Sequence, residues 1–540
     1  MRGQLRRLSS RAQDALGLAA LTVLAIGYAI YFIDFSRPPF EDAAILMRYA
    51  KHFAEGHGIV WNIGEAPIDG ATDFLFMICV ALLVKAGLSL ELATRSLGFV
   101  SHIATVWIVY LSLRRLCNAN IVISLLCAAY LAVGPGLYYV AAYFGTPFFA
   151  LFAAVAWRFA LQIIQRGENR ITALAFAFSA LVTALIRPEG VILTALMVLS
   201  LVYICGISRV SDTLRCYLAV FALIGGAYFL WRWTYFGFPL PNPYYKKGAG
   251  MLYSWSFKLS LWYTFKMCLP VMWAFLLGFY SKDTSRLTLG FTIPLAGFAS
   301  AFILIAHHTN FWGRFQYPLA PMAVMCWYPL TEGARKDVSF PKWRSMNLRK
   351  KSSAASVVAF LALLVLFYGV SLGRTAVYYK DGLYDMAKML SDYKGRGFTM
   401  ATTEAGLLPL YSGWRALDAW GLNDQWIAHH ERITEEYLDR FKPHLIVFHE
   451  WFSPLVEPAN TSGKWFEMVM TLKRYAEKHG YILAAAFGES PYDTHYYYVR
   501  PDFPESREIV KRIRDVDYRW FATGNQAINY ALVEKKPNDL

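Results

Sequence analysis

The chain has 540 residues, of which 56% are hydrophobic and 17% are charged, and its net charge is +15. Soluble domains carry about 25% charged residues, so the composition excludes an ordinary soluble protein. The excess of lysine and arginine gathers in a few short segments between apolar runs. This placement is typical of the positive-inside bias of membrane proteins, and it argues against nucleic acid as a partner.

The apolar runs predict a membrane body over residues 1–373. The first run follows several arginines. Because no small-residue cleavage site is evident before Asp34, we interpret this run as a retained span with its N-terminus inside, and a cleaved signal peptide is the alternative. Runs of about 20 residues can cross about 30 Å of hydrocarbon. The predicted spans are residues 16–34, 94–113, 120–136, 146–163, 171–187, 189–206, 216–233, 262–280, 287–306, 315–330 and 353–373.

One further apolar stretch, residues 74–90, is ambiguous, and the basic residues decide its topology. If it crosses the membrane, Arg114-Arg115 and Arg166/Arg170 fall outside. If it lies along the surface or re-enters, all the main basic segments are cytoplasmic, as the bias requires. We therefore predict about eleven spans in a polytopic α-helical membrane protein, with residues 374–540 on the extracytoplasmic side. The basic segments are residues 114–115, 166–170, 209–215, 282–286 and 331–352.

Glu41 and Asp42 follow the first predicted span directly, in an outer loop over residues 35–93. A carboxylate pair at the edge of a membrane is costly unless it faces water, a cation or a reacting polar group. We therefore expect a catalytic pair, or a pair that binds a divalent cation. The alternative is a solvated N-cap of the amphipathic surface helix that is predicted over residues 43–55.

Other polar residues cluster in the predicted outer loops. His57 lies between two glycines, so a plain turn is the simpler interpretation of it, and Asp69 follows in the same loop. Arg187 and Glu189 flank a proline between two apolar spans. Charges so close to hydrocarbon normally pair, snorkel or face a cavity, so a structural ion pair and a substrate contact both remain open.

Two later outer loops carry further candidates. The aromatic segment 231–247 fits an interfacial belt, but it also contains Asn242, Lys246 and Lys247, and outward lysines could hold a lipid-borne phosphate. The segment 307–315 contains His308 and Arg314. Adjacent histidines point apart on regular structure, which argues against a two-histidine metal site and favours hydrogen bonding to a sugar or phosphate.

The last 170 residues change to short alternating elements, which predict a small α/β domain. Asp418, Trp420 and Asn423 lie just after the predicted strand 415–417. Predicted strands are 398–402, 415–417, 445–449, 481–487 and 496–499, and predicted helices are 384–392, 434–440, 464–479 and 505–513. No Walker loop, GxSxG elbow, HExxH or cysteine-based motif is present.

Several stretches together resemble the GT-C glycosyltransferases, and most of all the terminal arabinofuranosyltransferases that use a polyprenyl-phosphate arabinofuranose donor. The similar stretches are Pro39-Phe40-Glu41-Asp42-Ala43-Ala44-Ile45, Glu55-Gly56-His57-Gly58, Asp69-Gly70-Ala71-Thr72, Arg187-Pro188-Glu189-Gly190, the loop from Tyr235 to Lys246, Thr402-Thr403-Glu404-Ala405-Gly406 and Asp418-Ala419-Trp420-Gly421-Leu422-Asn423-Asp424. The chain departs from that pattern at Glu41, where the family has an aspartate, at Gly145-Thr146, where a glutamate is absent, and at residues 307–310.

The resemblance implies inverting transfer of a sugar from a polyprenyl phosphate to an envelope glycan or glycolipid at the outer face of the bacterial plasma membrane. Asp42 or Glu41 would act as the base. Arg187, Lys246, Lys247 and Arg314 would stabilise the departing phosphate. No cofactor is required, although the two carboxylates could bind a divalent cation instead. A flippase for lipid-linked saccharides and a non-catalytic envelope scaffold are the competing hypotheses.

The resemblance also suggests a role for the C-terminal domain. Asp418, Trp420 and Asn423 could bind the glycan acceptor, and a plain lid with its aromatic residues in the core is the alternative.

Overall fold

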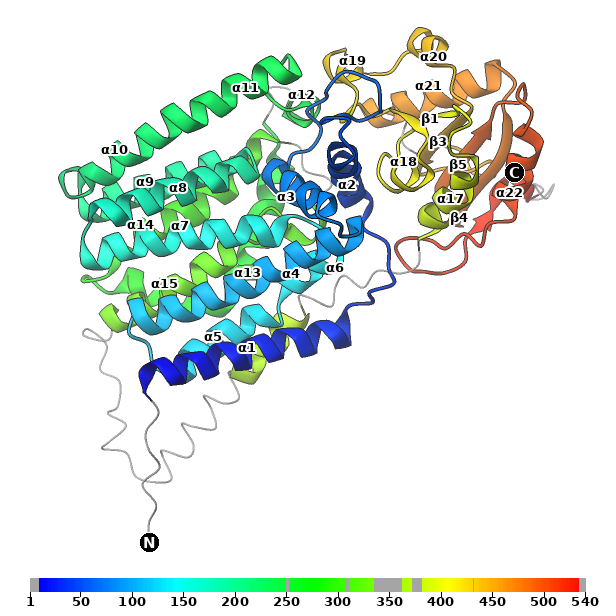
Figure 1. The fold of residues 1–540 in the computed structure, drawn as a ribbon. Helices are drawn as coiled ribbons and strands as arrows, with labels where there is room; N and C mark the ends of the chain where they lie inside the picture. Colours follow the sequence, from blue (N-terminus) through cyan, green and yellow to red (C-terminus); the bar gives the residue numbers. More distant parts are fainter. Residues whose placement is uncertain are drawn as a thin grey trace.

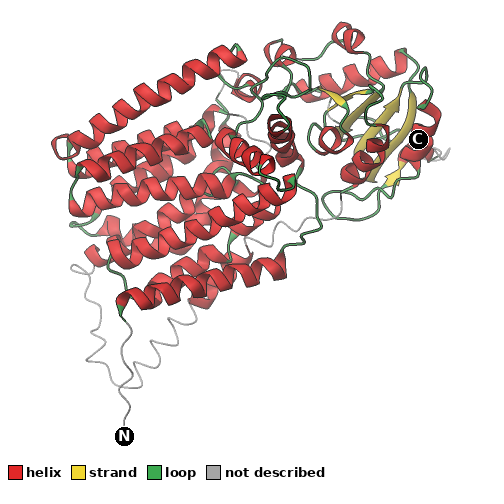
Figure 2. Ribbon diagram, viewed as in Figure 1, coloured by secondary structure: helices red, strands yellow, loops and turns green. Residues whose placement is uncertain are grey.

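The computed structural model describes residues 9–248, 252–305, 310–334, 362–371, 381–430, 432–459 and 461–533. A bundle of helices forms one part of the molecule, and a domain that contains all of the described strands forms the other (Figures 1 and 2). The helices α2 (Glu41–Ala54) and α3 (Phe74–Lys85) lie between the two parts.

Seven of the described helical segments are long and apolar enough to cross a membrane, and they coincide with seven of the predicted spans. The segments are Ser10–Phe32, Leu90–Leu116, Ile121–Ala141, Thr146–Arg166, Ile207–Phe236, Ser254–Tyr280 and Ser285–Leu304. Within them lie α1 (Ser10–Phe32), α4 (Leu90–Leu111), α5 (Ile121–Ala132), α6 (Pro135–Ala141), α7 (Thr146–Arg166), α10 (Ser211–Val220), α11 (Gly226–Phe236), α13 (Ser254–Tyr280) and α14 (Ser285–Ala301).

The other predicted spans correspond to shorter helices. These are α8 (Arg170–Ile186), α9 (Glu189–Cys205) and α15 (Leu319–Ala334). They have 16 or 17 residues, about 24–26 Å at 1.5 Å per residue, which is less than the hydrocarbon thickness. The predicted span 353–373 lies mostly outside the described residues, which include only the helix Ala362–Ser371 there. Length and composition therefore establish seven candidate spans among the described residues, and the count of eleven stays a prediction.

The ambiguous stretch 74–90 forms α3, which has 12 residues. At about 18 Å it is too short to cross the membrane alone. It packs against α2 at the end of the bundle nearest the strands (Figure 1). The predicted amphipathic helix is α2 itself, but most of its side chains are buried, because both α3 and α18 (Leu407–Ser412) pack against it.

The C-terminal domain is built on a six-stranded mixed sheet with the order β2-β1-β3-β5-β4-β6. The first three strands in chain order are parallel, and the later pairs are antiparallel. The five predicted strands are confirmed, and the two-residue β6 was not predicted. The strands are β1 (Thr399–Thr402), β2 (Arg415–Asp418), β3 (Leu445–Glu450), β4 (Ile482–Ser490), β5 (Asp493–Val499) and β6 (Ile528–Asn529).

The helices of this domain cover both faces of the sheet. The four predicted helices are present, whereas α18 and α19 (Gln425–His429) were not predicted. The predicted helices are α17 (Gly382–Leu390), α20 (Glu435–Phe441), α21 (Lys464–Lys478) and α22 (Ser506–Arg514).

Strand alternation joins the sheet to the membrane body. Successive side chains on a strand point to opposite faces, and here Val447 belongs to the same buried cluster as the bundle, whereas Ile446 and Phe448 belong to a second cluster on the far face. Tyr497 and Val499 follow the same rule on β5. One face of the sheet is therefore continuous with the core that contains α2.

Candidate functional site

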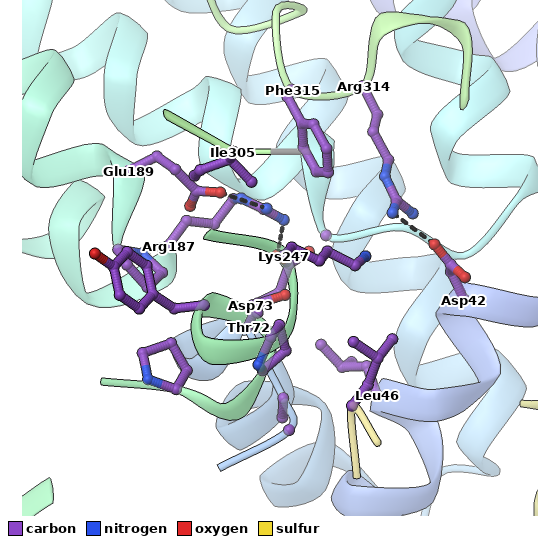
Figure 3. A pocket seen from close by; sticks show the side chains of 18 of the residues that line it. Asp42, Leu46, Thr72, Asp73, Arg187, Glu189, Lys247, Ile305, Arg314 and Phe315 are labelled. Carbon is purple, nitrogen blue, oxygen red and sulfur yellow. Dashed lines mark hydrogen bonds and ion pairs between the residues drawn. The ribbon is translucent and has the colours of Figure 1, made fainter. Parts of the chain in front are cut away.

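A cavity of about 420 Å³ lies where α2, α9, α12 (Asn242–Gly248) and the turn before α15 meet. Its wall is apolar over much of its area, with side chains such as Leu46, Ile192, Leu240 and Ile305. Three carboxylates and three cations also line it (Figure 3): Asp42, Asp73, Glu189, Arg187, Lys247 and Arg314.

Asp42 lies in the first turn of α2, where the positive end of the helix favours a carboxylate. Its Oδ2 accepts a hydrogen bond from Nη2 of Arg314 at 2.7 Å. The guanidinium of Arg314 packs over the ring of Phe144 at 4.4 Å and over Phe315 at 4.9 Å. Among the described residues Oδ1 of Asp42 has no hydrogen-bond partner, so this oxygen is available to a group that enters the cavity.

Arg187 lies between α8 and α9 and is buried. It donates to Asp73 and to Oε1 of Glu189, the latter at 3.1 Å, and it packs over Phe315 at 4.7 Å. The ion pair between Arg187 and Glu189, one of the two interpretations that the sequence allowed, is therefore present, and it faces the cavity. Asp73 was not selected from the sequence, although its place at the start of the apolar stretch 74–90 is the signal that could have identified it.

Lys247 belongs to α12, and its side chain extends toward the Asp42–Arg314 pair (Figure 3). Burial lowers the pKa of Lys247, and Arg314 and Arg187 lower it further, whereas Asp42 opposes the shift. A cation in such a place gains from an anionic ligand, because the ligand compensates both its burial and its cationic neighbours.

Glu41 does not share the cavity with Asp42. Its carboxylate accepts hydrogen bonds from the backbone N–H groups of Gly406 and Leu407, at 2.8 Å for Leu407. Burial and the nearby Glu404 raise the pKa of Glu41. The backbone passes so close that a Cβ at Gly406 would overlap the carbonyl of Glu41. The structure thus turns Glu41 toward the C-terminal domain and does not bring the two carboxylates together.

Several other predicted site residues lie beside the cavity rather than in it. Asp69 pairs with the buried Arg232 of α11, and its carbonyl accepts the N–H of Asn242 at 3.0 Å. Lys246 packs over the ring of Trp420 at 4.4 Å. His57 is exposed in its turn. His308 lies outside the described residues.

Asp418 and Asn423 close a tight turn of the C-terminal domain. The carboxylate of Asp418 accepts N–H groups of residues 420, 421 and 423, together with the Asn423 side-chain amide, at 2.9–3.1 Å. Burial raises the pKa of Asp418. Asn423 also accepts a hydrogen bond from Tyr49 of α2 at 3.1 Å. These contacts place Leu422 in the wall of the cavity.

Arg48, which sequence reasoning missed, joins α2 to the C-terminal domain. It is buried and donates to the carbonyls of Trp61, Pro409 and Trp414 and to the side chain of Asn62. No sequence pattern marks it, because two of its acceptors are main-chain groups more than 350 positions away.

Comparisons with known proteins identify similar sequences and folds. A model of a domain of unknown function, DUF8728, matches residues 374–503. A search of the curated proteins finds no match. The structure is similar to ArnT from Cupriavidus metallidurans in the apo state, with a TM-score of 0.55, 14% identity and coverage of 89% of this chain and 98% of that one.

Two further solved structures are similar. ArnT from the same organism bound to undecaprenyl phosphate gives a TM-score of 0.52 at 12% identity, over 91% of this chain and 98% of that one. The Archaeoglobus fulgidus oligosaccharyltransferase in the apo form gives 0.51 at 11% identity, over 91% and 74%. Identities this low show the fold alone. The chain is therefore a multi-pass helical membrane protein with a GT-C-like fold and a C-terminal mixed α/β domain.

Proposed function

We propose that the protein is an inverting glycosyltransferase that takes a sugar from a polyprenyl phosphate and attaches it to a glycan or glycolipid of the cell envelope. The Asp42–Arg314 pair, held in a cavity with Arg187 and Lys247, carries this proposal. Arabinofuranose is the sugar suggested by the sequence resemblance. The similar structure of ArnT with undecaprenyl phosphate supports a polyprenyl-phosphate donor.

The reaction needs a base and a place for negative charge. Oδ1 of Asp42 would take the proton of the acceptor hydroxyl as its oxygen attacks C1 of the sugar, and a positioned base contributes about 10²–10⁴-fold to the rate. The bond between C1 and the phosphate oxygen breaks in the same displacement, so the anomeric centre inverts. Lys247, Arg187 and Arg314 would stabilise the phosphate as it leaves with the electron pair.

The donor also has a long apolar tail, and the described residues offer it a path. A second cavity of about 270 Å³ lies between α8 and α11 and shares Pro188, Leu240 and Pro241 with the first. Its wall is mainly apolar, with Leu181, Leu185 and Phe229 among its residues. The polyprenyl chain would pass from the lipid through this side, with its phosphate beside Lys247.

For the reaction to use an envelope acceptor, the cavity must open on the outer face of a plasma membrane. This is the orientation that the basic segments favour, with residues 39–42 and the C-terminal domain outside and about eleven crossings in total. In this orientation the C-terminal domain covers the donor site and offers the acceptor a surface next to Asp418 and Asn423. Trp420 and Lys246 would form its edge.

The test is a transfer assay with the purified full-length protein in detergent. A panel of polyprenyl-phosphate sugars is mixed with membrane glycolipids, and transfer and release of polyprenyl phosphate are measured together with the configuration of the new linkage. We expect one donor to be used with inversion. Retention of configuration, or transport of a lipid-linked saccharide into vesicles without transfer from any donor, would contradict the proposal.

A further inference from the structure

Three side chains of the C-terminal sheet converge on one point away from the cavity. Glu404 follows β1, His449 lies on β3 and His495 lies on β5. His449 and His495 are directly opposite each other in the β3–β5 pair, so their side chains share a face of the sheet. One potential ligand atom from each of the three residues lies within 4.8 Å of the others.

Each of the two histidine rings is oriented by a hydrogen bond between one of its nitrogens and a neighbouring side chain. Nε2 of His449 bonds to Oδ1 of Asp493 at 2.6 Å, and Nδ1 of His495 bonds to the hydroxyl of Tyr518 at 2.7 Å. Nδ1 of His449 and Nε2 of His495 are therefore the ring nitrogens left for a ligand. Metal-binding histidines almost always hold their other ring nitrogen in this way, with a carboxylate or another polar group as partner.

The carboxylate of Glu404 is positioned in the same manner. Its Oε1 accepts a hydrogen bond from the hydroxyl of Thr403 at 3.1 Å. That hydroxyl in turn accepts the N–H of His449 at 3.0 Å. The loop after β1 and the strand β3 are thus tied together around the three side chains.

Aromatic residues wall the site on one side. The ring of Trp520 lies 4.8 Å from that of His495, and the ring of Phe521 lies 6.0 Å from it. His495 is only 1% exposed. An apolar wall limits the access of water, which strengthens the attraction between a cation and a carboxylate.

We propose that Glu404, His449 and His495 bind one divalent transition-metal ion, with Zn²⁺ as the best match. Two imidazoles and one carboxylate form a donor set that Zn²⁺ uses when three protein ligands leave a fourth position for water. Soft cysteine ligands are absent from the cluster, and hard cations such as Mg²⁺ prefer oxygen ligands. The site does not depend on the proposed transferase activity.

The ion would stabilise the loop that holds Glu41. Glu404 lies two residues before Gly406, whose N–H binds the Glu41 carboxylate at the start of α2. Fixing Glu404 to β3 and β5 therefore fixes the contact between the C-terminal domain and the helix that carries Asp42. Metal binding is expected to raise the temperature of thermal unfolding, because the ion binds the folded state.

The test uses the full-length protein, treated with a chelator and then dialysed against Zn²⁺, with metal content measured by mass spectrometry. We expect one equivalent of Zn²⁺ in the parent protein and less than a tenth of that in Glu404→Gln and His495→Ala. Asp493→Asn, which removes the partner of His449, should lower the affinity about 10–100-fold. His479→Ala, at a histidine outside the cluster, and Asp42→Asn should bind as the parent does.

Cobalt substitution in the parent protein keeps the test decisive if the variants fail to fold. X-ray absorption at the cobalt edge should show two imidazole nitrogens and one or two oxygens, and Co²⁺ should raise the unfolding temperature of the parent. A parent protein that takes up no Zn²⁺ would overturn the proposal, and so would a bound metal without imidazole ligands. Folded Glu404→Gln and His495→Ala variants that bind Zn²⁺ as the parent does would also overturn it.

Discussion

Replacing Arg48 with methionine should loosen the contact between the C-terminal domain and α2. The side chain is 4% exposed and donates to four acceptors, two of them in the segment 409–414. Methionine fills similar space but removes all four hydrogen bonds, and among the described residues only the Pro409 carbonyl and the Asn62 side chain keep a second donor, the N–H groups of Gly413 and Ala416. A hydrogen bond to a charged group is worth about 1.5–3 kcal/mol. Losing the two to residues 409 and 414 should therefore cost about 3–6 kcal/mol, or about 10²–10⁴ in the equilibrium for opening this contact.

Hydrogen exchange followed by mass spectrometry measures this opening. In Arg48→Met the amides of α18 and β2 should exchange about 10² times faster or more, whereas those of β5, which lie deeper in the sheet, should change little. Arg415→Met is the matched control, because Arg415 pairs across the same contact with Glu65 but is about half exposed, and such pairs are worth about 1 kcal/mol or less. Equal effects of the two substitutions would refute the reasoning.

Three further predictions concern the donor, the pH and the membrane body. Lys247→Met should raise the KM for a polyprenyl-phosphate donor about tenfold or more, because it removes a charge-assisted contact. Lys246→Met, which changes the contact with Trp420, should raise the KM less. The reverse order of the two KM values would argue against a phosphate beside Lys247. Burial raises the pKa of Asp381, the N-cap of α17, to about 7. Because the folded state then holds this proton more tightly than the unfolded state, the stability of the C-terminal domain should fall as the pH rises from about 4 to about 7. Asp381→Asn keeps the cap, and its thermal melts should lack this part of the pH dependence. An unchanged pH profile in this variant would count against the prediction. Asp69→Asn should destabilise the protein by about 3–5 kcal/mol, because it leaves Arg232 buried without its counter-charge. The double variant Asp69→Leu with Arg232→Leu should lose less stability. A double variant that unfolds at a lower temperature than Asp69→Asn would contradict this.

Much of the fold could be predicted because its signals are local. Apolar runs in α1, α7 and α14 are long enough to mark spans, and short runs of β-branched and aromatic residues in β3 and β5 mark buried strands. The short elements α18, α19 and β6 carry too few residues for a periodic signal. The helices α8, α9 and α15 have about the lengths of the predicted runs 171–187, 189–206 and 315–330, so the sequence located them and also showed that they are short.

The sequence predicted many of the charged residues that line the cavity, but not which of them contact one another. Asp42, Arg187, Lys247 and Arg314 come from four separate stretches, and the structure brings them to one cavity. The sequence could not separate Glu41 from Asp42, because consecutive helical residues differ in direction by about 100° and only the docked loop at Gly406 decides which one faces the cavity. The pairing of Asp73 with Arg187 spans 114 positions and has no local signal.

The rate of transfer by Asp42→Asn tests the central claim most directly. With saturating donor and acceptor, a single-turnover measurement should show transfer about 10²–10⁴ times slower than in the parent, because asparagine keeps the contact with Arg314 within reach but cannot accept the proton. Asp34→Asn, at an exposed aspartate between α1 and α2, should transfer at the parent rate. Transfer by Asp42→Asn at the parent rate would contradict the role of Asp42 as the base.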